Sequence, residues 1–363
     1  MLQLRNYVFK LCVLEIAGKL IDWYAGHKRE LPWRETRDPY CIWISEIILQ
    51  QTRVAQGLDY YHRFMLQFPN IRELAEAPED EVMKCWQGLG YYSRARNLHA
   101  AAKDMMLRFG GRFPQNYNDV LSLKGIGDYT AAAICSFAWK QPYAVVDGNV
   151  YRVLSRFFGI ETPIDSNQGK KDFKTLAQEL IDLKHPDLYN QAIMDFGAIQ
   201  CTPQSPDCCR CPLQDGCRAY AGGRGGVLPV KAGKTVVKPR YFNYFHICCG
   251  DATLLHRREA KDIWQNLYEY PLIETAEAVD FSELQQSIEY RNLMAGVEPV
   301  QVLQFVEMPR HILSHRIIYA RFYKLAVSHF GPEMSDFLQV EIDELDKYAV
   351  PRLIELYHGM ESV

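Results

Sequence analysis

The run CTPQSPDCCRCPLQDGC, residues 201–217, carries the most informative pattern in the chain. Its cysteines include four with the spacing C-x6-C-x2-C-x5-C, which are Cys201, Cys208, Cys211 and Cys217. Thiolates are soft ligands that suit zinc or iron–sulfur centres. Four of them close around one metal centre and leave no open position for a substrate. The run therefore predicts a structural metal centre at the end of the N-terminal region.

The spacing also bears on the identity of that centre. Zinc sites usually pair two C-x2-C knuckles across a longer loop. The compact, uneven spacing here favours a 4Fe–4S cluster held by four cysteines, with Cys209 as a bystander. A disulfide cluster is disfavoured because nothing at the N-terminus resembles a signal peptide. We expect a protein of the reducing cytosol.

Composition sets wide limits on function. The 363-residue chain has a net charge of −3 and an ordinary globular composition. Whole-chain charge therefore does not indicate nucleic-acid binding, and any DNA contact would use local basic patches and backbone amides. No apolar run is long enough to cross a membrane.

Three regions follow one another along the chain. Residues 1–220 are predicted to be helical, because apolar residues recur at helical spacing. The clearest segments are WISEIILQQTRV (43–54), EDEVMKCW (79–86), SRARNLHAAAKDMMLRF (93–109) and TAAAICSFAW (130–139). Residues 221–240 are rich in glycine and basic residues and contain no acidic residue, which is typical of a linker.

Residues 241–363 mix strand and helix patterns and predict an α+β domain. Strands are expected in YFNYFHICCG (241–250) and DATLLHRR (251–258), and two more in VLQFVEMPRHILSHRIIYARFYKLAV (302–327). The segment VPRLIELYHGM (350–360) predicts a closing helix.

A glycine-containing turn precedes one of the helices, in LKGIGDYTAAAICSF (123–137). Gly125 and Gly127 permit a tight turn and close approach of another backbone. The free amides at the start of the helix form an anion site that needs no charged side chain. We predict a helix-hairpin-helix over about 121–137, which holds a DNA phosphate without reading sequence.

Two carboxyl groups are candidates for chemistry. Asp147 in AVVDGNVYRVLSRF (144–157) precedes a helix, where capping alone would explain it. Glu46 lies among isoleucines at helical spacing, so burial is expected to raise its pKa. A carboxyl that stays protonated near neutral pH can act as a general acid. An exposed glutamate on a half-buried helix is an equally favoured alternative.

Together these motifs resemble the endonuclease III superfamily of base-excision DNA glycosylases, and within it the adenine DNA glycosylase (MutY) family. The resemblance rests on LPWR (31–34), SEIILQQTRV (45–54), QGLGYYSRARNLHAAA (87–102), LKGIGDYTAAAI (123–134), VVDGNVYRVLSR (145–156) and the cysteine run. It implies a multidomain protein, in which an all-α helix-hairpin-helix glycosylase domain with a 4Fe–4S cluster precedes an α+β Nudix-like domain.

The resemblance assigns catalytic roles to four residues. Glu46 matches the acid that protonates adenine at N7, and Asp147 matches the carboxylate that stabilises the oxocarbenium-like sugar. This division of roles is that of two-carboxylate glycosidases. Tyr129 and Asn149 match neighbours that hold the reacting sugar and water.

The resemblance also assigns contacts with DNA. The wall of the pocket for the flipped adenine is assigned to Arg29, Leu31, Trp33 and Arg34. The residues that enter the duplex beside the partner base are assigned to Gln51, Thr52, Leu89 and Tyr91. The base must leave the stack to be reached, and an aromatic wedge such as Tyr91 offsets the lost stacking.

One position separates relatives that also cut the DNA backbone. Those relatives carry a lysine that attacks the sugar to form a Schiff base, and Tyr129 stands at that place here. A phenol cannot form an imine. The sequence therefore predicts base removal without efficient strand cleavage.

The C-terminal domain resembles the Nudix-like domain of the family through IWQNLYEYPLIE (263–274) and HILSHR (311–316). The closely spaced carboxylates of the Nudix box are absent from the sequence, so pyrophosphatase activity is not predicted. A Phe-Ser-His loop contacts 8-oxoguanine in the family. Ser314 and His315 are assigned to that contact, whereas Leu313 replaces the aromatic residue.

The predicted function is removal of adenine opposite 8-oxoguanine or guanine in duplex DNA, by hydrolysis of the N-glycosidic bond in base excision repair. The alternatives are a bifunctional lyase, opposed by Tyr129, and a cluster-bearing DNA-binding module without catalysis, opposed by the two carboxyl groups. The expected partner is double-stranded DNA, with no membrane and no second subunit. The expected location is the bacterial cytoplasm at the nucleoid, or the nucleus of a eukaryote.

Overall fold

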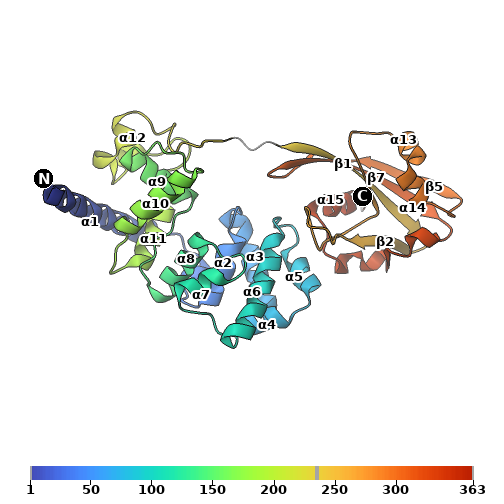
Figure 1. Ribbon diagram of the computed structural model, residues 1–363, viewed down its shortest axis with the longest axis horizontal. Helices are drawn as coiled ribbons and strands as arrows, with labels where there is room; N and C mark the ends of the chain where they lie inside the picture. The colour runs from blue at the N-terminus through green and yellow to red at the C-terminus, as the bar shows by residue number, and fades with distance from the viewer. Residues whose placement is uncertain (1, 234–236, 362–363) are drawn as a thin grey trace. The chain divides into compact units, whose positions relative to one another are not determined.

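The computed structural model describes residues 2–233 and 237–361, with side chains from residue 15 to 360 within those ranges (Figure 1). The chain divides into two compact units. The first consists of residues 1–75 and 100–233, and the second of residues 76–99 and 234–363. Helices prevail in the first and strands in the second. The sequence places residues 76–99 in the helical region, whereas in the structure they group with the strands.

The helical unit is built from helices joined by short loops. Its elements are α1 (Leu2–His27), η1 (Pro32–Arg34), α2 (Pro39–Ile48), α3 (Val54–Gln67), α4 (Ile71–Glu76), α7 (Tyr117–Ser122), α8 (Asp128–Trp139), α9 (Gly148–Phe158), α10 (Asn167–Leu180), α11 (Pro186–Asp195), η2 (Phe196–Gln200), η3 (Cys208–Arg210), η4 (Gln214–Gly216) and α12 (Arg218–Ala221). Helix α6 (Ser93–Phe109) spans the division between the units. A core of buried apolar side chains joins α1 with α8 to α11 and includes Leu20, Phe173 and Tyr189. This core positions the starts of α8 and α9.

The expectation of one continuous helix through WISEIILQQTRV is wrong. Helix α2 ends at Ile48 and α3 begins at Val54. Gln51, between them, has a left-handed backbone with φ of 58°, which a helix cannot contain. Apolar periodicity continued across the break because both helices bury apolar side chains.

The second unit contains an eight-stranded sheet in which the order β3-β2-β1-β7-β5 forms the main path. Its elements are α5 (Glu79–Trp86), β1 (Lys238–Cys249), β2 (Ala252–Arg257), β3 (Tyr268–Glu269), β4 (Leu272–Thr275), α13 (Phe281–Gln286), α14 (Ile288–Leu293), β5 (Val300–Glu307), β6 (His311–Ile312), β7 (Arg316–Val327), η5 (Pro332–Met334), β8 (Leu338–Glu341), η6 (Ile342–Lys347) and α15 (Arg352–Glu361). The long strands β1 and β7 pair in parallel, and the other pairs are antiparallel. Where two strands were expected in 302–327, the structure has three, because the short β6 also pairs with β7.

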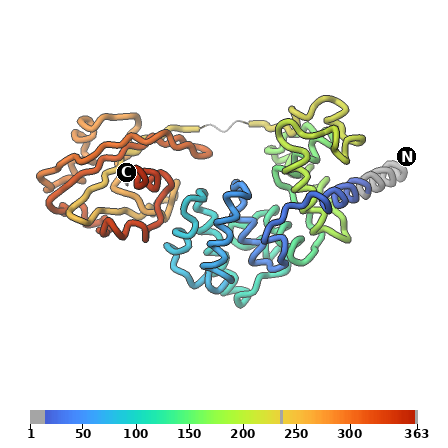
Figure 2. Tube along the Cα trace, turned by 180° about the vertical axis from the view of Figure 1, so that it is seen from behind, coloured from blue at the N-terminus to red at the C-terminus, as the bar shows by residue number. Residues whose placement is uncertain are grey.

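Both faces of this sheet are covered, because side chains of a strand alternate between faces. On β1, Phe242 and Tyr244 enter a core with Leu353 and Tyr357 of α15. The next residues in the alternation, Phe245 and Ile247, enter a second core with α13 and α14. The trace in Figure 2 shows the C-terminal helix in red against the orange strands of the same unit. The α+β prediction is confirmed.

One close backbone contact in the helical unit requires glycine. A Cβ atom on Gly197, in the π-helical turn η2, would stand 2.6 Å from Cβ and 2.9 Å from the carbonyl oxygen of Asn149 on α9. Such distances are below van der Waals contact, so one backbone would have to move.

We expect Gly197→Ala to lower the free energy of unfolding by about 1–3 kcal/mol, as overpacking does. Gly18→Ala is the matched control, because Gly18 lies in α1 with nothing within 4 Å of its added Cβ; it should stabilise by about 0.5–1 kcal/mol. Urea unfolding of the three proteins measures both. Equal stabilities for Gly197→Ala and the parent protein would contradict the contact.

Candidate active site

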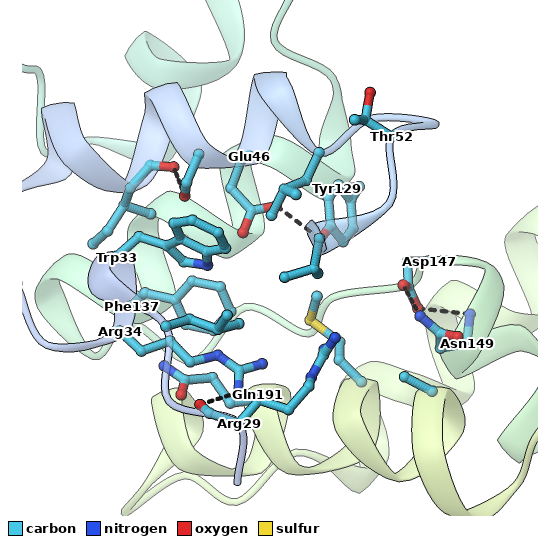
Figure 3. A pocket seen from close by; sticks show the side chains of 17 residues that line it. Arg29, Trp33, Arg34, Glu46, Thr52, Tyr129, Phe137, Asp147, Asn149 and Gln191 are labelled. Atoms are coloured by element: carbon cyan, nitrogen blue, oxygen red, sulfur yellow. Dashed lines mark hydrogen bonds between the residues drawn. The ribbon is translucent and has the colours of Figure 1, made fainter. Parts of the chain in front are cut away.

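A cavity of about 200 Å³ in the helical unit is lined by all four expected catalytic residues (Figure 3). Its lining is Arg29, Leu31, Trp33, Arg34, Ile42, Ser45, Glu46, Leu49, Thr52, Val54, Tyr129, Phe137, Asp147, Asn149, Gln191, Met194 and Ala198. These residues come from the loop after α1, from α2 and the turn into α3, from α8 and α11, from η2, and from the start of α9. A concave site with a few convergent polar groups is typical of a ligand pocket.

Glu46 is the most deeply buried acid of the cavity. It lies on α2 with only 8% of its surface exposed, so the alternative of an exposed glutamate is wrong. Burial raises the pKa of Glu46 to about 7, and the charge of Asp147 adds to the rise. The hydrogen bond from the Tyr129 hydroxyl, at 2.8 Å, and the charge of Arg34 oppose it. The carboxyl can therefore hold or give up a proton near neutral pH.

Asp147 caps α9 and also lines the cavity. Its Oδ1 accepts hydrogen bonds from the amides of Asn149 at 2.9 Å and Val150 at 2.8 Å, and its Oδ2 accepts one from Asn149 Nδ2 at 2.8 Å. Burial raises the pKa of Asp147, but these three bonds oppose the rise. Capping and a role at the cavity thus occur together in one side chain.

Tyr129 stands at the start of α8, where the charges of both acids, Glu46 and Asp147, act on its hydroxyl. Burial raises the pKa of Tyr129 well above its ordinary value, and the charges of Glu46 and Asp147 add to the rise. The side chain therefore remains a neutral phenol that donates to Glu46 Oε2. No lysine is among the residues that line this cavity.

Two arginines form one wall through a shared carboxylate. Asp195, at the end of α11, is fully buried. It accepts hydrogen bonds from Arg34 at 2.6 and 2.8 Å and from Arg29 Nε at 2.9 Å. Burial would raise the pKa of Asp195, but the guanidinium groups hold it below its usual value. Leu31 and Trp33 beside them are buried.

The turn between α7 and α8 has the expected hairpin geometry. Gly125 has φ of 82°, a left-handed conformation that favours glycine. Gly127 precedes the first residue of α8, and no side chain in the described part of the chain caps that helix. A Cβ on Gly127 would meet nothing within 4 Å. The space beside Gly127 is therefore free of other side chains, and the start of α8 has no side-chain cap.

Gln51 and Thr52 lie in the turn between α2 and α3. Gln51 is exposed, and Thr52 is half-buried and lines the cavity. A non-glycine residue in the left-handed region, such as Gln51, stores strain that is frequent at functional sites. The structure thus brings Thr52, but not Gln51, to the catalytic cavity.

The other predicted contacts belong to the second unit. Tyr91 has φ of 47° and is 47% exposed, and its hydroxyl lies 2.7 Å from Ser314 Oγ. Both line a cavity of about 470 Å³ with Leu313 and His315. Leu313 also packs against the core beneath α15. Leu89, in contrast, is buried, with 7% of its surface exposed.

The four cysteines of the run lie around one loop with free thiols. Burial raises the pKa of the Cys211 thiol to about 11, and the charges of Cys201, Cys208 and Cys217 add to it. Among the described residues, no group of three or more His, Cys, Asp or Glu side chains is gathered tightly enough for one metal ion. Four cysteine thiolates are the ligand set of a 4Fe–4S cluster. The donor set fits such a cluster.

Helix α9 ties this loop to the cavity. Arg156 donates to the carbonyls of Thr202 at 2.7 Å and Pro203 at 3.1 Å. Arg152 donates to the carbonyls of Cys201 at 2.8 Å and Gly197 at 2.6 Å. The helix that Asp147 caps therefore also holds the cysteine loop.

Sequence reasoning missed several residues of the cavity. They are Ile42, Ser45, Leu49, Val54, Phe137, Gln191, Met194 and Ala198. Asp195, which holds the arginine wall, was also missed. Ser45 could have been found, because it adjoins Glu46 on the quoted helix. The residues of α11 carried no local signal, because they meet the loop after α1 only in the folded chain.

No helix in the described part of the chain is long and apolar enough to span a membrane.

Comparisons with known proteins define the class first. Residues 44–181 match the family model of the HhH-GPD superfamily of base excision DNA repair proteins, and residues 243–358 match that of the NUDIX domain. A thermostable thymine-DNA glycosylase has a TM-score of 0.54 and 32% identity, covering 57% of this chain and 95% of that structure. Endonuclease III bound to DNA shares the fold, with a TM-score of 0.52 and 23% identity over 59% of this chain and 97% of that one.

Relatives narrow the class to one family. An adenine DNA glycosylase of Buchnera aphidicola subsp. Baizongia pistaciae is 32% identical over 306 residues, which is 83% of each chain. The adenine DNA glycosylase of Mus musculus is 42% identical over 61% of this chain and 45% of its own length. The chain belongs to the adenine DNA glycosylase family.

The raised pKa of Glu46 makes stability depend on pH. The native protein keeps this proton up to about pH 7, and the unfolded chain keeps it only to the ordinary pKa of 4.5. Stability contributed by this group is therefore lost as pH rises through that window. As pH rises from 4.5 to 8, the free energy of unfolding of Glu46→Gln should increase by about 3 kcal/mol relative to that of the parent protein.

Denaturant unfolding at several pH values checks this prediction. Glu179→Gln, an exposed glutamate of α10, is the control and should show no such trend. A constant difference between Glu46→Gln and the parent protein across the window would contradict the burial of an ionisable Glu46.

Proposed function

We propose that this protein removes adenine paired with 8-oxoguanine or guanine in duplex DNA, by hydrolysis of the N-glycosidic bond and without cutting the strand. The observation that carries the proposal is the pair of Glu46 and Asp147 in one cavity, with a pKa near 7 for the first. Membership of the adenine DNA glycosylase family supports it. The protein would act where the cell keeps its DNA.

Glu46 suits the role of general acid. Tyr129 donates to its Oε2, so the proton of the neutral carboxyl resides on Oε1, free to pass to N7 of the flipped adenine. The C1′–N9 electron pair then moves into the purine, which leaves as a neutral base. Water adds its oxygen to C1′, and its proton returns to a carboxylate.

Asp147 suits the role of electrostatic stabiliser. Its carboxylate would face the positive charge that develops on the sugar. The three hydrogen bonds from Asn149 and Val150 orient it and favour its ionised form. Asn149 in turn is fixed by Arg152, which donates to its Oδ1 at 2.8 Å. The two carboxyl groups thus have environments that separate their roles.

The lesion contact would belong to the second unit. Tyr91 and Ser314 share a hydrogen bond at the edge of a cavity of about 470 Å³. A base that displaced Tyr91 from this bond could form a hydrogen bond with the Ser314 hydroxyl, which can act as donor or acceptor. Guanine and 8-oxoguanine differ at N7 and C8, where one hydroxyl can distinguish them. Leu313 holds this loop to the core in place of an aromatic residue.

The cysteine loop would have a structural role. Cys201, Cys208, Cys211 and Cys217 would hold the 4Fe–4S cluster, which supplies a cross-link within the loop when bound. Arg152 and Arg156 would transmit its order to α9. The amides at the start of α8 would hold a DNA phosphate beside the cavity.

Glu46→Gln and Asp147→Asn should bind duplex DNA normally and lose about 10²–10⁴-fold in single-turnover release of adenine. A glutamine amide at position 46 cannot protonate the base, and an asparagine amide at position 147 lacks the negative charge. Alkali treatment and gel separation measure release, and gel shift measures binding. Near-normal rates in either variant would remove that residue from the mechanism.

The strand should stay intact until treated with alkali, and borohydride should trap little covalent complex, because Tyr129 cannot form an imine. Tyr129→Lys should increase trapping, since its amine would lie beside the sugar site. Tyr129→Phe is the control that removes the hydroxyl without adding an amine. Efficient trapping of the parent protein would show that it is a lyase.

Changing Ser314 and His315 together to alanine should reduce the preference for 8-oxoguanine over guanine by about 5- to 150-fold, the equivalent of roughly 1–3 kcal/mol. Catalysis on adenine opposite guanine should change little. Ser335→Ala, at an exposed serine, is the control. Single-turnover rates on both duplexes decide it, and an unchanged ratio would place lesion recognition elsewhere.

A further inference from the structure

A cavity of about 250 Å³ in the helical unit adjoins the catalytic cavity. It lies among the start of α8, the segment before α9, α9 itself and α10, and is called the α10 cavity here because Lys170 and Lys174 of α10 line it. Tyr129 lines both this cavity and the catalytic cavity. Val146, the residue before Asp147, also lines it. The α10 cavity therefore adjoins the catalytic cavity close to the place proposed for the sugar.

The charged groups of the α10 cavity leave a positive charge in excess. Lys170 and Lys174 are exposed and lie about one helical turn apart on α10. The ammonium group of Lys170 has no ion-pair or hydrogen-bond partner among the described residues. Asp128 is the one acid in the lining of this cavity, and its Oδ1 accepts a hydrogen bond from Lys174 Nζ at 2.6 Å. Two lysines thus face one carboxylate.

The ion pair of Asp128 and Lys174 can be exchanged at small cost. Lys174 lowers the pKa of Asp128, and the Tyr117 hydroxyl donates to the same Oδ1 at 3.3 Å, so the carboxylate is ionised. Both side chains of the ion pair are 62% exposed, and such a pair contributes little to stability. An ammonium group has three N–H donors. Lys174 can therefore bind a second acceptor beside Asp128 or in its place.

The neutral polar groups of the cavity complete a set of donors. Gln178 is occupied, because its Oε1 accepts from the Ala144 amide at 3.1 Å and its Nε2 donates to the Pro142 carbonyl at 2.7 Å. Burial raises the pKa of Tyr151, whose ring packs edge-on against Phe173 of α10 at 5.1 Å. Its phenol therefore keeps its O–H. Cations and hydroxyl donors without an unpaired carboxylate suit an oxyanion.

DNA supplies such an oxyanion at this place. Each deoxyribose within a strand is joined to two phosphates, and the sugar of the flipped nucleotide would lie beside Asp147. The strand carries one negative charge per nucleotide. The phosphates on either side of that sugar are therefore the anions that the strand brings nearest to the α10 cavity. A lysine binds a phosphate as a compact point charge.

We propose that the α10 cavity binds a backbone phosphate next to the flipped nucleotide, with Lys170 and Lys174 as its cations, and that this phosphate takes Lys174 over from Asp128. The inference rests on the proposed glycosylase function. It adds a contact by side chains of α10 to the one proposed for the backbone amides of the hairpin. Anchoring this phosphate would hold the sugar of the flipped nucleotide beside Asp147.

The salt dependence of DNA binding tests the lysines. The full-length protein is titrated onto a duplex with 2′-fluoro-2′-deoxyadenosine opposite 8-oxoguanine, in which the fluorine disfavours the oxocarbenium-like state and keeps the base in place. Lys170→Ala should weaken binding and reduce the slope of log K against log salt by about 0.9, the value for one phosphate contact. Lys170→Arg keeps the cation and should behave like the parent protein.

Lys171→Ala is the matched control, because Lys171 is an exposed neighbour on the same helix that does not line the cavity. It removes the same charge and should leave the slope close to that of the parent protein. Equal reductions in Lys170→Ala and Lys171→Ala would mean a general attraction between α10 and DNA, and would overturn the phosphate site.

Neutral methylphosphonate linkages show whether the anion is a backbone phosphate. They replace, one at a time, the two linkages that flank the adenosine analogue. At one of them the parent protein should lose affinity, whereas Lys170→Ala should lose less than about twofold, because its contact is already gone. Equal losses for the two proteins at both linkages would show that Lys170 binds neither phosphate, and would overturn the inference.

A charge removal tests the exchange of Lys174. Asp128→Asn should strengthen binding about two- to fivefold, because the phosphate no longer competes with a carboxylate for the ammonium group. Glu179→Gln removes an exposed acid of α10 that does not line the cavity and controls for net charge. A gain in Asp128→Asn no larger than that of the control would overturn the exchange and the proposal that includes it.

The inference and the proposed function fail in different ways. Adenine release by the parent protein, together with unchanged DNA binding by Lys170→Ala, would overturn the inference alone. Failure of the parent protein to release adenine from an unmodified duplex would overturn the proposed function and the inference that rests on it.

Discussion

The buried carboxylate of Asp195 is the interaction on which the rest of the site depends. It accepts hydrogen bonds from both Arg29 and Arg34 and has no exposed surface. A buried carboxylate without cations would be prohibitively costly, and two guanidinium groups would repel each other without an anion between them. The triad is therefore stable only as a whole. Its two arginines form one wall of the catalytic cavity.

Helix α9 connects the catalytic cavity with the cysteine loop. Its first residues carry Asp147 and Asn149, and its later turns carry Arg152 and Arg156, which donate to loop carbonyls. Gly197 lets the turn after Asp195 touch the start of α9. A displacement of the loop would consequently reach Asp147 through one rigid element. The cysteine loop is thus coupled to Asp147 through this helix.

Much of the architecture could be predicted from local patterns. The helical region, the hairpin at Gly125 and the α+β second unit all follow from apolar periodicity and glycine placement, which depend on near neighbours. The break at Gln51 was missed, because both flanking helices bury apolar residues and the period runs across the turn. The short β6 was missed because two residues carry too little pattern.

The sequence by itself determined the types of the elements, the candidate acids and the donor set of four cysteines, since these are properties of neighbouring residues. Only the tertiary structure decided that Glu46 is buried beside Tyr129, that Tyr91 meets Ser314, and that Asp195 joins residues 161 and 166 positions away. Burial sets the pKa of Glu46, and burial is a property of the folded chain. Contacts across such separations leave no local period, so chain packing alone reveals them.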